Sequence, residues 1–178
     1  ASPWSPPAYM KTNGEMNNGG KLKPEFMQLW ADYYVKYIEK MKEKNIDIWA
    51  VTVQNEPAAI QVWDSCEYTA EEERDFVKNY LGPTFHKNNL QDKKIIIWDH
   101  NRDIAYERAK IVLEDKEASK YIYGTGIHWY MSEEFSNLSK IHDEFPDKHI
   151  IFTEGCQEGG VHLGSWDTGE RYGRNIIG

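Results

Sequence analysis

The sequence has no long hydrophobic run and few cysteines. Its longest apolar stretches fall far short of the roughly 18 apolar residues that a membrane-spanning helix needs. The two cysteines, Cys66 and Cys156, are too few for a disulfide scaffold and too far apart for a zinc knuckle. We interpret them as free thiols, although a contact between them stays open because both follow a predicted strand end. The start of the chain carries no signal peptide.

Basic residues are also outnumbered. Twenty-one Lys and Arg stand against 29 Asp and Glu, which gives a net charge of −8. Such a chain does not suit the phosphate backbone of a nucleic acid, so we exclude that class of partner. The acidic balance points to no other partner. The 178 residues are enough for one domain with a sizeable core.

Short apolar segments alternate with longer amphipathic ones. Four near-continuous apolar runs predict buried strands over Ile46–Val53, Ile95–Trp98, Gly124–Trp129 and His149–Phe152. Helices are predicted over Pro24–Lys44, from a capping box at Thr69 and Glu72 to a stop at Gly82-Pro83, over Asp103–Asp115, from about Phe135 to Pro146, and from about Thr168. This alternation is typical of a parallel sheet covered by helices.

Two parallel folds fit this pattern. A doubly wound sheet usually has a glycine-rich phosphate turn after a strand, and the sequence has none. In a (β/α)₈ TIM barrel the chemistry lies on the loops after the strands. Polar clusters stand at those places: Gln54-Asn55-Glu56, Asp99-His100-Asn101, His128-Trp129-Tyr130 and Thr153-Glu154-Gly155-Cys156. We therefore predict a TIM barrel, and at about 31 residues per strand–helix unit the chain holds five to six units, an interior part of a larger barrel.

Glu56 and Glu154 each end a predicted strand, about three units apart, so both should project from one rim. Two carboxylates on one rim are what glycoside hydrolysis requires, one as proton donor and one as ionised partner. Whichever of the two is the donor needs a raised pKa while its partner is ionised. The alternative is that each glutamate is a strand-end residue bonded to backbone or to an arginine.

The neighbours of the two glutamates favour a catalytic role. The amide of Asn55 is placed to hold a sugar hydroxyl, and Tyr130 is placed to donate to an ionised Glu154. Aromatic rings stack on the C–H faces of sugars, and five of them lie on or beside the same loops: Trp4, Tyr9, Trp63, Trp129 and Trp166. A single ring is more often ordinary packing, but five on one rim indicate a carbohydrate cleft.

Five runs, in this order and spacing, resemble glycoside hydrolase family 30, the glucosylceramidase-like enzymes: SPWSPPAYMKTNG, WAVTVQNEP, GIHWY, FTEGC and LGSWDTGERY. RDFVKNYLGPTF and DKEASKYIYG between them resemble the same family, so the similarity covers essentially the whole chain. NEP alone is common among barrel glycosidases, whereas the ordered set is specific.

The resemblance implies a retaining mechanism without a cofactor. It makes Glu56 the general acid/base at the end of the fourth strand and Glu154 the nucleophile at the end of the seventh. In these roles we expect Glu56 to have a raised pKa while Glu154 is ionised. It places Asn55, His128 and Tyr130 in the glycon pocket with Trp129 between them, and it adds Tyr9, Trp63 and Trp166 as substrate contacts. The implied substrate is a β-glucoside, a β-glucan or a glucosyl-lipid, and the implied protein is secreted.

The chain departs from the family in several respects. Strands one, two and eight and the flanking β-sandwich are absent from it, so we expect residues 1–178 alone to be inactive and either unstable or self-associated. Tyr9 stands where the family often has tryptophan. The stretch AAIQVWDSCEYTAEEE resembles the bacterial and fungal β-1,6-glucanase branch more than the animal glucosylceramidase branch.

Two other functions stay open. A metal-dependent barrel hydrolase would use His100, His128 and His162 with Asp99 and Glu154, although no HxH or HExxH spacing is present. A non-catalytic carbohydrate-binding barrel is opposed only by the presence of both glutamates.

Overall fold

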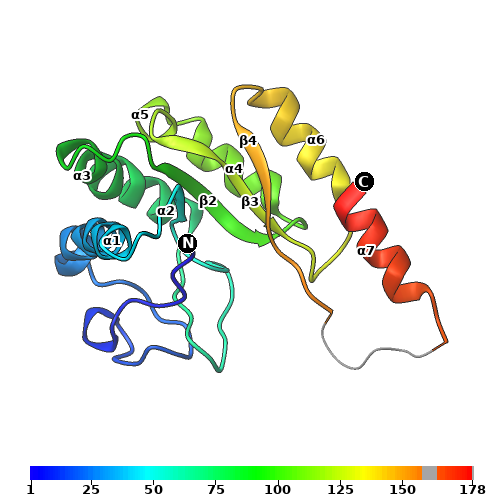
Figure 1. Ribbon diagram of the computed structural model, residues 1–178, viewed down its shortest axis with the longest axis horizontal. Helices are drawn as coiled ribbons and strands as arrows, with labels where there is room; N and C mark the ends of the chain where they lie inside the picture. The colour runs from blue at the N-terminus through cyan, green and yellow to red at the C-terminus, as the bar shows by residue number, and fades with distance from the viewer. Residues whose placement is uncertain (158–163, 178) are drawn as a thin grey trace.

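A four-stranded parallel sheet organises the chain, whose computed structural model describes residues 1–157 and 164–177 (Figure 1). The strands are β1 (Ala50–Thr52), β2 (Lys94–Asn101), β3 (Ile122–His128) and β4 (His149–Glu154). They lie side by side in the order β1-β2-β3-β4, and every neighbouring pair is parallel. A doubly wound sheet reverses its strand order at a switch point, so the unbroken sequential order favours the barrel.

Helices connect the strands and pack against their neighbours along the chain. They are α1 (Met27–Lys42), α2 (Ala70–Phe76), α3 (Gly82–Lys87), α4 (Ala105–Leu113), α5 (Lys116–Ser119), α6 (Phe135–Glu144) and α7 (Asp167–Ile177), with 3₁₀ turns η1 (Ala8–Met10) and η2 (Pro24–Phe26). α2 packs on α4, and α4 packs on α6. Among the described residues, none of these helices has the length and hydropathy to cross a membrane.

The core forms between the sheet and this helical layer. On α1, Trp30, Tyr34 and Ile38 are buried at intervals of four residues, which places them on one face of the helix. The hydroxyl of Tyr34 donates to the carbonyl of Val53 at 2.6 Å and so ties α1 to the end of β1. The apolar spacing predicted from the sequence thus fixes how α1 sits on the sheet.

The first strand is shorter than predicted. β1 covers only Ala50–Thr52, and the side chains of Ile46 and Trp49 before it are about half exposed. The backbone of Ala1 pairs with the edge of β1 that does not face β2. The amino group of Ala1 donates to the carbonyl of Ala50 at 2.8 Å, and the amide of Thr52 donates to the carbonyl of Ala1 at 2.9 Å. The N-terminal stretch therefore lies where a preceding strand would lie. Unit counting predicts about five strands, and four are formed in the described part.

The predicted stop at Gly82-Pro83 is wrong, because the helical path continues there. A π-helical segment, η3 (Val77–Leu81), joins α2 to α3. Pro83 lies in the first turn of α3, and its missing N–H does not interrupt the helical path. A Cβ atom on Gly82 would lie 2.3 Å from the ring of Tyr121, so this glycine permits close packing and does not end a helix.

Other boundaries agree closely with the sequence. Thr69 and Glu72 form the predicted capping box at the start of α2. α6 ends at Glu144, before Phe145 and Pro146. The predicted helix over Asp103–Asp115 corresponds to α4. A separate short helix that was not predicted, α5, follows it, and the side chain of Asp115 caps its start.

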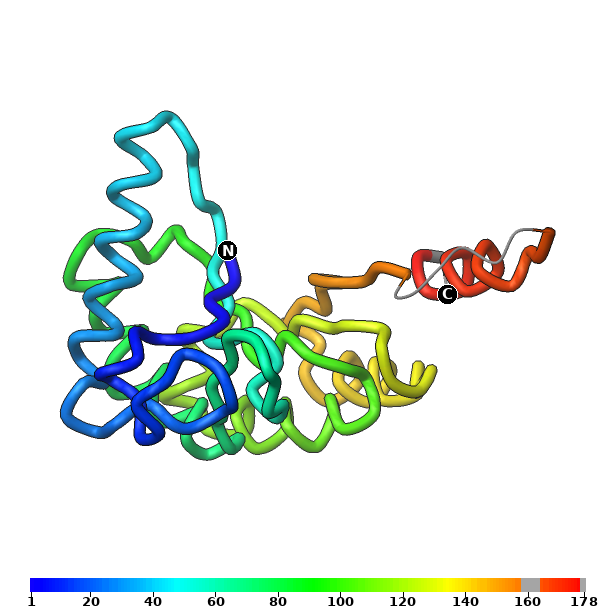
Figure 2. Tube along the Cα trace, turned by 90° about the horizontal axis from the view of Figure 1, so that it is seen from below, coloured from blue at the N-terminus to red at the C-terminus, as the bar shows by residue number. Residues whose placement is uncertain are grey.

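The first and last parts of the chain lie towards opposite edges of the sheet. Figure 2 shows α1 at one end of the molecule and α7 at the other. Beyond β4 the described residues provide no further strand, and Phe152 on β4 is 44% exposed.

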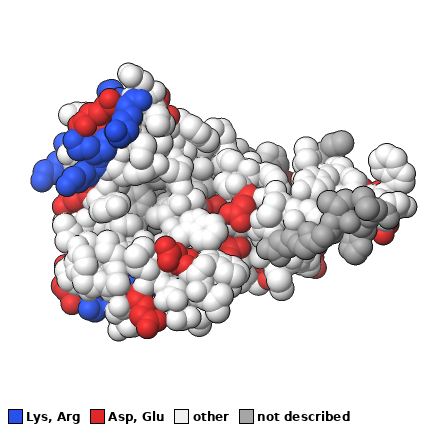
Figure 3. Space-filling view, turned by 60° about the horizontal axis from the view of Figure 1, so that its bottom comes forward, with Lys and Arg blue, Asp and Glu red and all other residues white. Residues whose placement is uncertain are grey.

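Figure 3 shows Asp and Glu side chains around the middle of one face, while Lys and Arg gather at one end.

Candidate active site

Glu56 lies beyond the carboxyl end of β1, directly beside β2. The backbone pairing between the two strands continues past Thr52, since the amide of Val53 donates to Ile96 and the amide of Glu56 donates to the carbonyl of Asp99, both at 3.0 Å. Glu56 itself has a φ of 47°, in the left-handed region that non-glycine residues seldom adopt. The carboxylate is therefore held at the rim by a constrained backbone.

Glu154 ends β4 at the same rim of the sheet, the one formed by the carboxyl ends of the strands. It stands opposite His128 of β3 in the parallel register, and all carboxyl ends of parallel strands meet at one edge. The hydroxyl of Tyr130 donates to Glu154 Oε1 at 3.0 Å, which confirms the contact predicted from the sequence. The thiol of Cys156 lies 3.4 Å from the same hydroxyl.

His128 connects the two halves of the rim. Its Nδ1 lies 3.2 Å from Glu56 Oε1, and its Nε2 lies 3.1 Å from Asp99 Oδ1. Its ring also meets the ring of Tyr130 edge-on, with 5.9 Å between centroids. The side chain is fully buried. One continuous network therefore joins Glu56, Asp99, His128, Tyr130 and Glu154.

The charges of this network shift the pKa values of its members. Burial alone lowers the pKa of His128, but its hydrogen bonds with Asp99 and Glu56 outweigh burial and raise the pKa to about 9. The hydrogen bond from His128 lowers the pKa of Glu56. Burial works to raise the pKa of Asp99, yet hydrogen bonds from His128 and Ser2 keep it below its ordinary value.

This result corrects the expectation that Glu56 has a raised pKa. That expectation considered only the repulsion between two carboxylates. The structure adds two imidazoles next to Glu56, those of His128 and His100, and a positive charge beside a carboxylate favours its ionised form. The proton of the Glu56–His128 pair therefore lies on the histidine.

Asp99 reaches His128 because β2 is irregular at this point. Trp98 and Asp99 both have positive φ values, 69° and 50°, and the register between β2 and β3 shifts between Trp98 and His100. The amide of Trp98 donates to Glu73 Oε1 at 2.8 Å, and Arg108 lies 3.3 Å from the other oxygen of Glu73. A buried ion pair on two helices thus supports the bulge. Sequence reasoning missed this role of Glu73, because the residue resembles any other acidic position in the first turn of a helix.

His100 also faces Glu56, with 3.6 Å between His100 Nδ1 and Glu56 Oε1. Its ring centroid lies 6.1 Å from that of His128, and burial lowers its pKa. Of the predicted metal set, the structure therefore brings His100 and His128 together with Glu56, a carboxylate that this hypothesis did not include. Asp99 contacts the far side of His128, and His162 lies outside the described residues.

Asn55 is placed as predicted, next to Glu56 at the rim. Its side chain is only 4% exposed, and in the described part of the chain its Oδ1 is buried without a hydrogen-bond partner. A buried carbonyl oxygen without a partner is costly in a finished structure, so a ligand hydroxyl would stabilise it.

The aromatic residues divide into two groups. Trp4, Tyr9, Trp63 and Trp166 are exposed by 42% to 84%, so each has a free face. Trp129 is only 1% exposed, and its predicted role as a stacking ring is therefore corrected. Its indole packs on Tyr172 at 4.6 Å and donates to the carbonyl of Cys156 at 3.1 Å. Trp129 therefore stabilises the loop that follows Glu154.

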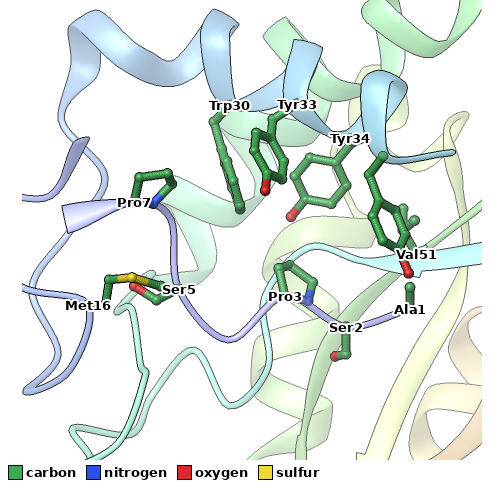
Figure 4. Close-up of a pocket in the computed structure, with 11 residues that line it drawn as sticks. Ala1, Ser2, Pro3, Ser5, Pro7, Met16, Trp30, Tyr33, Tyr34 and Val51 are labelled. Carbon is green, nitrogen blue, oxygen red and sulfur yellow. The ribbon is translucent and has the colours of Figure 1, made fainter. Parts of the chain in front are cut away.

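A separate cavity of about 510 Å³ lies between α1 and the N-terminal stretch (Figure 4). The rings of Trp30, Tyr33 and Tyr34 line it from α1. Neither Glu56 nor Glu154 belongs to its lining, so its shape says nothing about the rim. The two cysteines do not pair: Cys66 is a buried free thiol and Cys156 an exposed one.

A parallel α/β barrel section with two carboxylates on its carboxyl-terminal rim is the arrangement of the barrel glycosidases. Residues 1–178 match the glycosyl hydrolase family 30 TIM-barrel domain, and the chain belongs to glycoside hydrolase family 30. The predicted fold and family are thereby confirmed.

Known relatives agree with this assignment. The chain is 37% identical to the lysosomal acid glucosylceramidase of Mus musculus over 193 residues, which cover 99% of this chain and 37% of the mouse protein. The crystal structure of SrfJ from Salmonella typhimurium matches with a TM-score of 0.89 and 41% identity over 93% of this chain and 37% of SrfJ. The endo-beta1,6-glucanase BT3312 matches with a TM-score of 0.79 and 36% identity over 86% of this chain and 36% of its own.

The chain spans about 37% of the length of the mouse enzyme and of SrfJ. Among curated proteins it is 37% identical to the mouse glucosylceramidase over 99% of its length and 31% identical to the endo-1,6-beta-D-glucanase of Neurospora crassa over 86%, so overall identity does not favour the glucanase branch.

Proposed function

We propose that this chain supplies both catalytic carboxylates of a retaining β-glycosidase that acts by double displacement. Glu154 is the nucleophile, and Glu56 is the general acid/base. The observation that supports this proposal is the network on one rim in which Glu56 contacts His128 and Glu154 accepts from Tyr130. A strand-end glutamate with a purely structural role would not need a partner network that reaches the other glutamate.

In the first step Glu154 attacks the anomeric carbon, and the glycosidic bond breaks. His128 first passes its proton to Glu56 along their 3.2 Å contact, and Glu56 gives this proton to the leaving oxygen, which leaves Glu56 ionised for the second step. The hydroxyl of Tyr130 donates to Glu154 Oε1 at 3.0 Å and orients the carboxylate for attack. In the second step Glu56 removes a proton from water, which hydrolyses the glycosyl-enzyme and frees Glu154. The lowered pKa of Glu56 suits this second role as a base.

The proposed substrate class is β-glucosides, including β-glucans and glucosyl-lipids. The Oδ1 atom of Asn55, which has no partner in the described part of the chain, offers a hydrogen bond to a hydroxyl of the sugar bound next to the nucleophile. The predicted sugar contact of His128 is corrected, because its side chain is fully buried and its two ring nitrogens face Glu56 and Asp99. The exposed rings of Trp63 and Trp166 offer stacking faces for the leaving group, whether a further sugar or a lipid. A glucosylceramidase and a glucanase among the relatives support the same class of bond.

Azide rescue tests the proposal in a protein that contains the complete barrel around this chain. Glu154→Ala should lower kcat on an aryl β-glucoside by several orders of magnitude. Azide should restore turnover by attacking from the side that the carboxylate has left, and NMR should identify an α-glycosyl azide. Wild-type turnover in this variant, or a β-azide product, contradicts the assignment of Glu154. A protein that binds glucosides but never turns them over is instead the non-catalytic barrel.

A further inference from the structure

Three side chains at the rim form a group with the composition of a transition-metal site. Glu56, His100 and His128 each offer one ligand atom, and these atoms lie within 4.8 Å of one another. Glu56 Oε1 lies 3.2 Å from His128 Nδ1 and 3.6 Å from His100 Nδ1. In a tetrahedral zinc site with bonds of about 2.0–2.1 Å, neighbouring ligand atoms are ~3.3 Å apart. Two of the three distances between the ligand atoms are therefore already close to the length that a zinc site requires.

The surroundings of the group match the second requirement of a metal site. A histidine that binds a metal through one nitrogen usually donates its other N–H to a carboxylate, which orients the ring. The Nε2 atom of His128 faces Asp99 Oδ1 at 3.1 Å, which leaves Nδ1 directed at Glu56 and His100. In the described part of the chain, His100 Nδ1 is buried without a hydrogen-bond partner. A ligand atom that is already desolvated and unpartnered favours a bound cation.

We propose that Glu56, His100 and His128 bind Zn²⁺ or a similar borderline divalent cation, and that this ion inhibits the glycosidase. Two imidazoles and one carboxylate select zinc, cobalt or copper over magnesium and calcium, which prefer oxygen ligands. The inhibitory part rests on the proposed function, because a Glu56 carboxylate held by a metal carries no proton for the leaving oxygen. The binding part does not depend on activity.

His100 distinguishes this site from the catalytic machinery. Proton transfer in the proposed mechanism uses Glu56 and His128 only, whereas the cation needs the third ligand. The competing site for a soft cation is the thiol of Cys156, which lies 3.4 Å from the Tyr130 hydroxyl and close to Glu154. A cobalt ion held by a thiolate shows a sulfur-to-metal charge-transfer band in the near ultraviolet, and one held by nitrogen and oxygen does not.

Titration of the 178-residue chain with Co²⁺ tests the binding. The expected result is one saturable ion per chain with the visible absorption of a tetrahedral site and no thiolate band, displaced by Zn²⁺ but not by Mg²⁺. His100→Asn should weaken binding at least tenfold, which is the low end of the effect seen even for outer-shell residues. The control is His142→Asn on α6, where the histidine is exposed, and it should bind as the wild type does. Far-UV circular dichroism checks that each variant is folded, and His100→Gln serves if His100→Asn is not.

Several outcomes overturn the site. Absence of saturable Co²⁺ binding does so, as does binding that survives both His100 variants or is lost in Cys156→Ser. The second experiment measures how strongly Zn²⁺ inhibits hydrolysis of an aryl β-glucoside by the complete barrel. His142→Asn should be inhibited as the wild type is, and His100→Asn should need at least tenfold more Zn²⁺ for the same inhibition. If the complete barrel binds cobalt but has no glycosidase activity, the metal site is supported and the proposed function is contradicted. If it is active but binds no cobalt, the proposed function is supported and the metal site is contradicted.

Discussion

His128 Nδ1 lies 3.2 Å from Glu56 Oε1, although 72 residues separate the two in the sequence. The contact places a buried imidazole between the proposed acid/base and Asp99, so the protonation of Glu56 depends on a second titrating group. A carboxylate and an imidazole this close share their protons as a pair. Changes to that pair, or to the backbone that supports it, should therefore alter both activity and stability.

Replacing Glu56 by Gln should separate its two roles. The amide cannot give a proton, so substrates with poor leaving groups should lose far more activity than activated aryl β-glucosides, which leave without protonation. The measurement is kcat/KM for an alkyl and a dinitrophenyl glucoside in the complete barrel. Equal losses on both substrates would show that Glu56 is not the acid.

The pH dependence of stability should report the charge of His128. Its pKa is raised in the folded protein to about 9 from an ordinary value near 6.5. A raised pKa means that the stabilisation is complete below about pH 6.5 and disappears as the pH rises through about 9. The loss should be of the order of 3 kcal/mol, because one pKa unit corresponds to about 1.4 kcal/mol.

Urea unfolding between pH 6 and 10, with EDTA present, measures this loss. His128→Asn should be less stable at pH 6 and should show a flatter profile across the window, whereas His142→Asn should behave as the wild type does. A wild-type stability that is constant from pH 6 to 10 would mean that the folded protein does not hold His128 in its protonated form. The lowered pKa values of Glu56 and Asp99 act at the other end of the range, where their contribution is lost as the pH falls below their ordinary values.

Glu73 should be essential for the bulge that presents Asp99. Its buried carboxylate accepts from the Trp98 amide and pairs with Arg108, whose side chain is 12% exposed. Glu73→Leu leaves the Trp98 amide without an acceptor and removes the carboxylate partner of Arg108, so it should cost about 3–5 kcal/mol of unfolding free energy. Glu73→Gln keeps one acceptor and should cost less, while the exposed neighbour variant Glu71→Gln should stay within about 0.5 kcal/mol of the wild type.

A second measurement links Glu73 to the site. In Glu73→Gln, NMR titration should show a lower pKa for His128, because a relaxed bulge moves Asp99 away from Nε2. A destabilised variant with an unchanged His128 titration would show that Glu73 supports only the core.

The sequence alone was sufficient for the order of the four strands, the capping box at Thr69 and the strand-end positions of both glutamates, because each depends on local patterns of apolar and polar residues. It overestimated the length of β1, whose first predicted residues are half exposed. It was also sufficient for the contact between Tyr130 and Glu154, since both lie at the ends of neighbouring strands. It could not predict the lowered pKa of Glu56 or the burial of Trp129. Both depend on contacts between residues far apart in the sequence, His128 with Glu56 and Tyr172 with Trp129.

The last prediction concerns the outer edge of β4. A barrel closes only when its first and last strands pair, and the described strands number four. β4 therefore has an unpaired edge in the described part of the chain, with Phe152 exposed beside it, and unpaired edges recruit other chains.

We expect the 178-residue chain by itself to self-associate and to lack turnover of β-glucosides. Light scattering coupled to size exclusion should show dimers or larger species whose proportion increases with concentration. Phe152→Lys should shift them towards monomer, since charge on an edge strand opposes pairing, while Ile111→Lys on α4, where the isoleucine is 38% exposed, should not. A monomer at all concentrations that hydrolyses aryl β-glucosides would show that the rim is complete within these four strands.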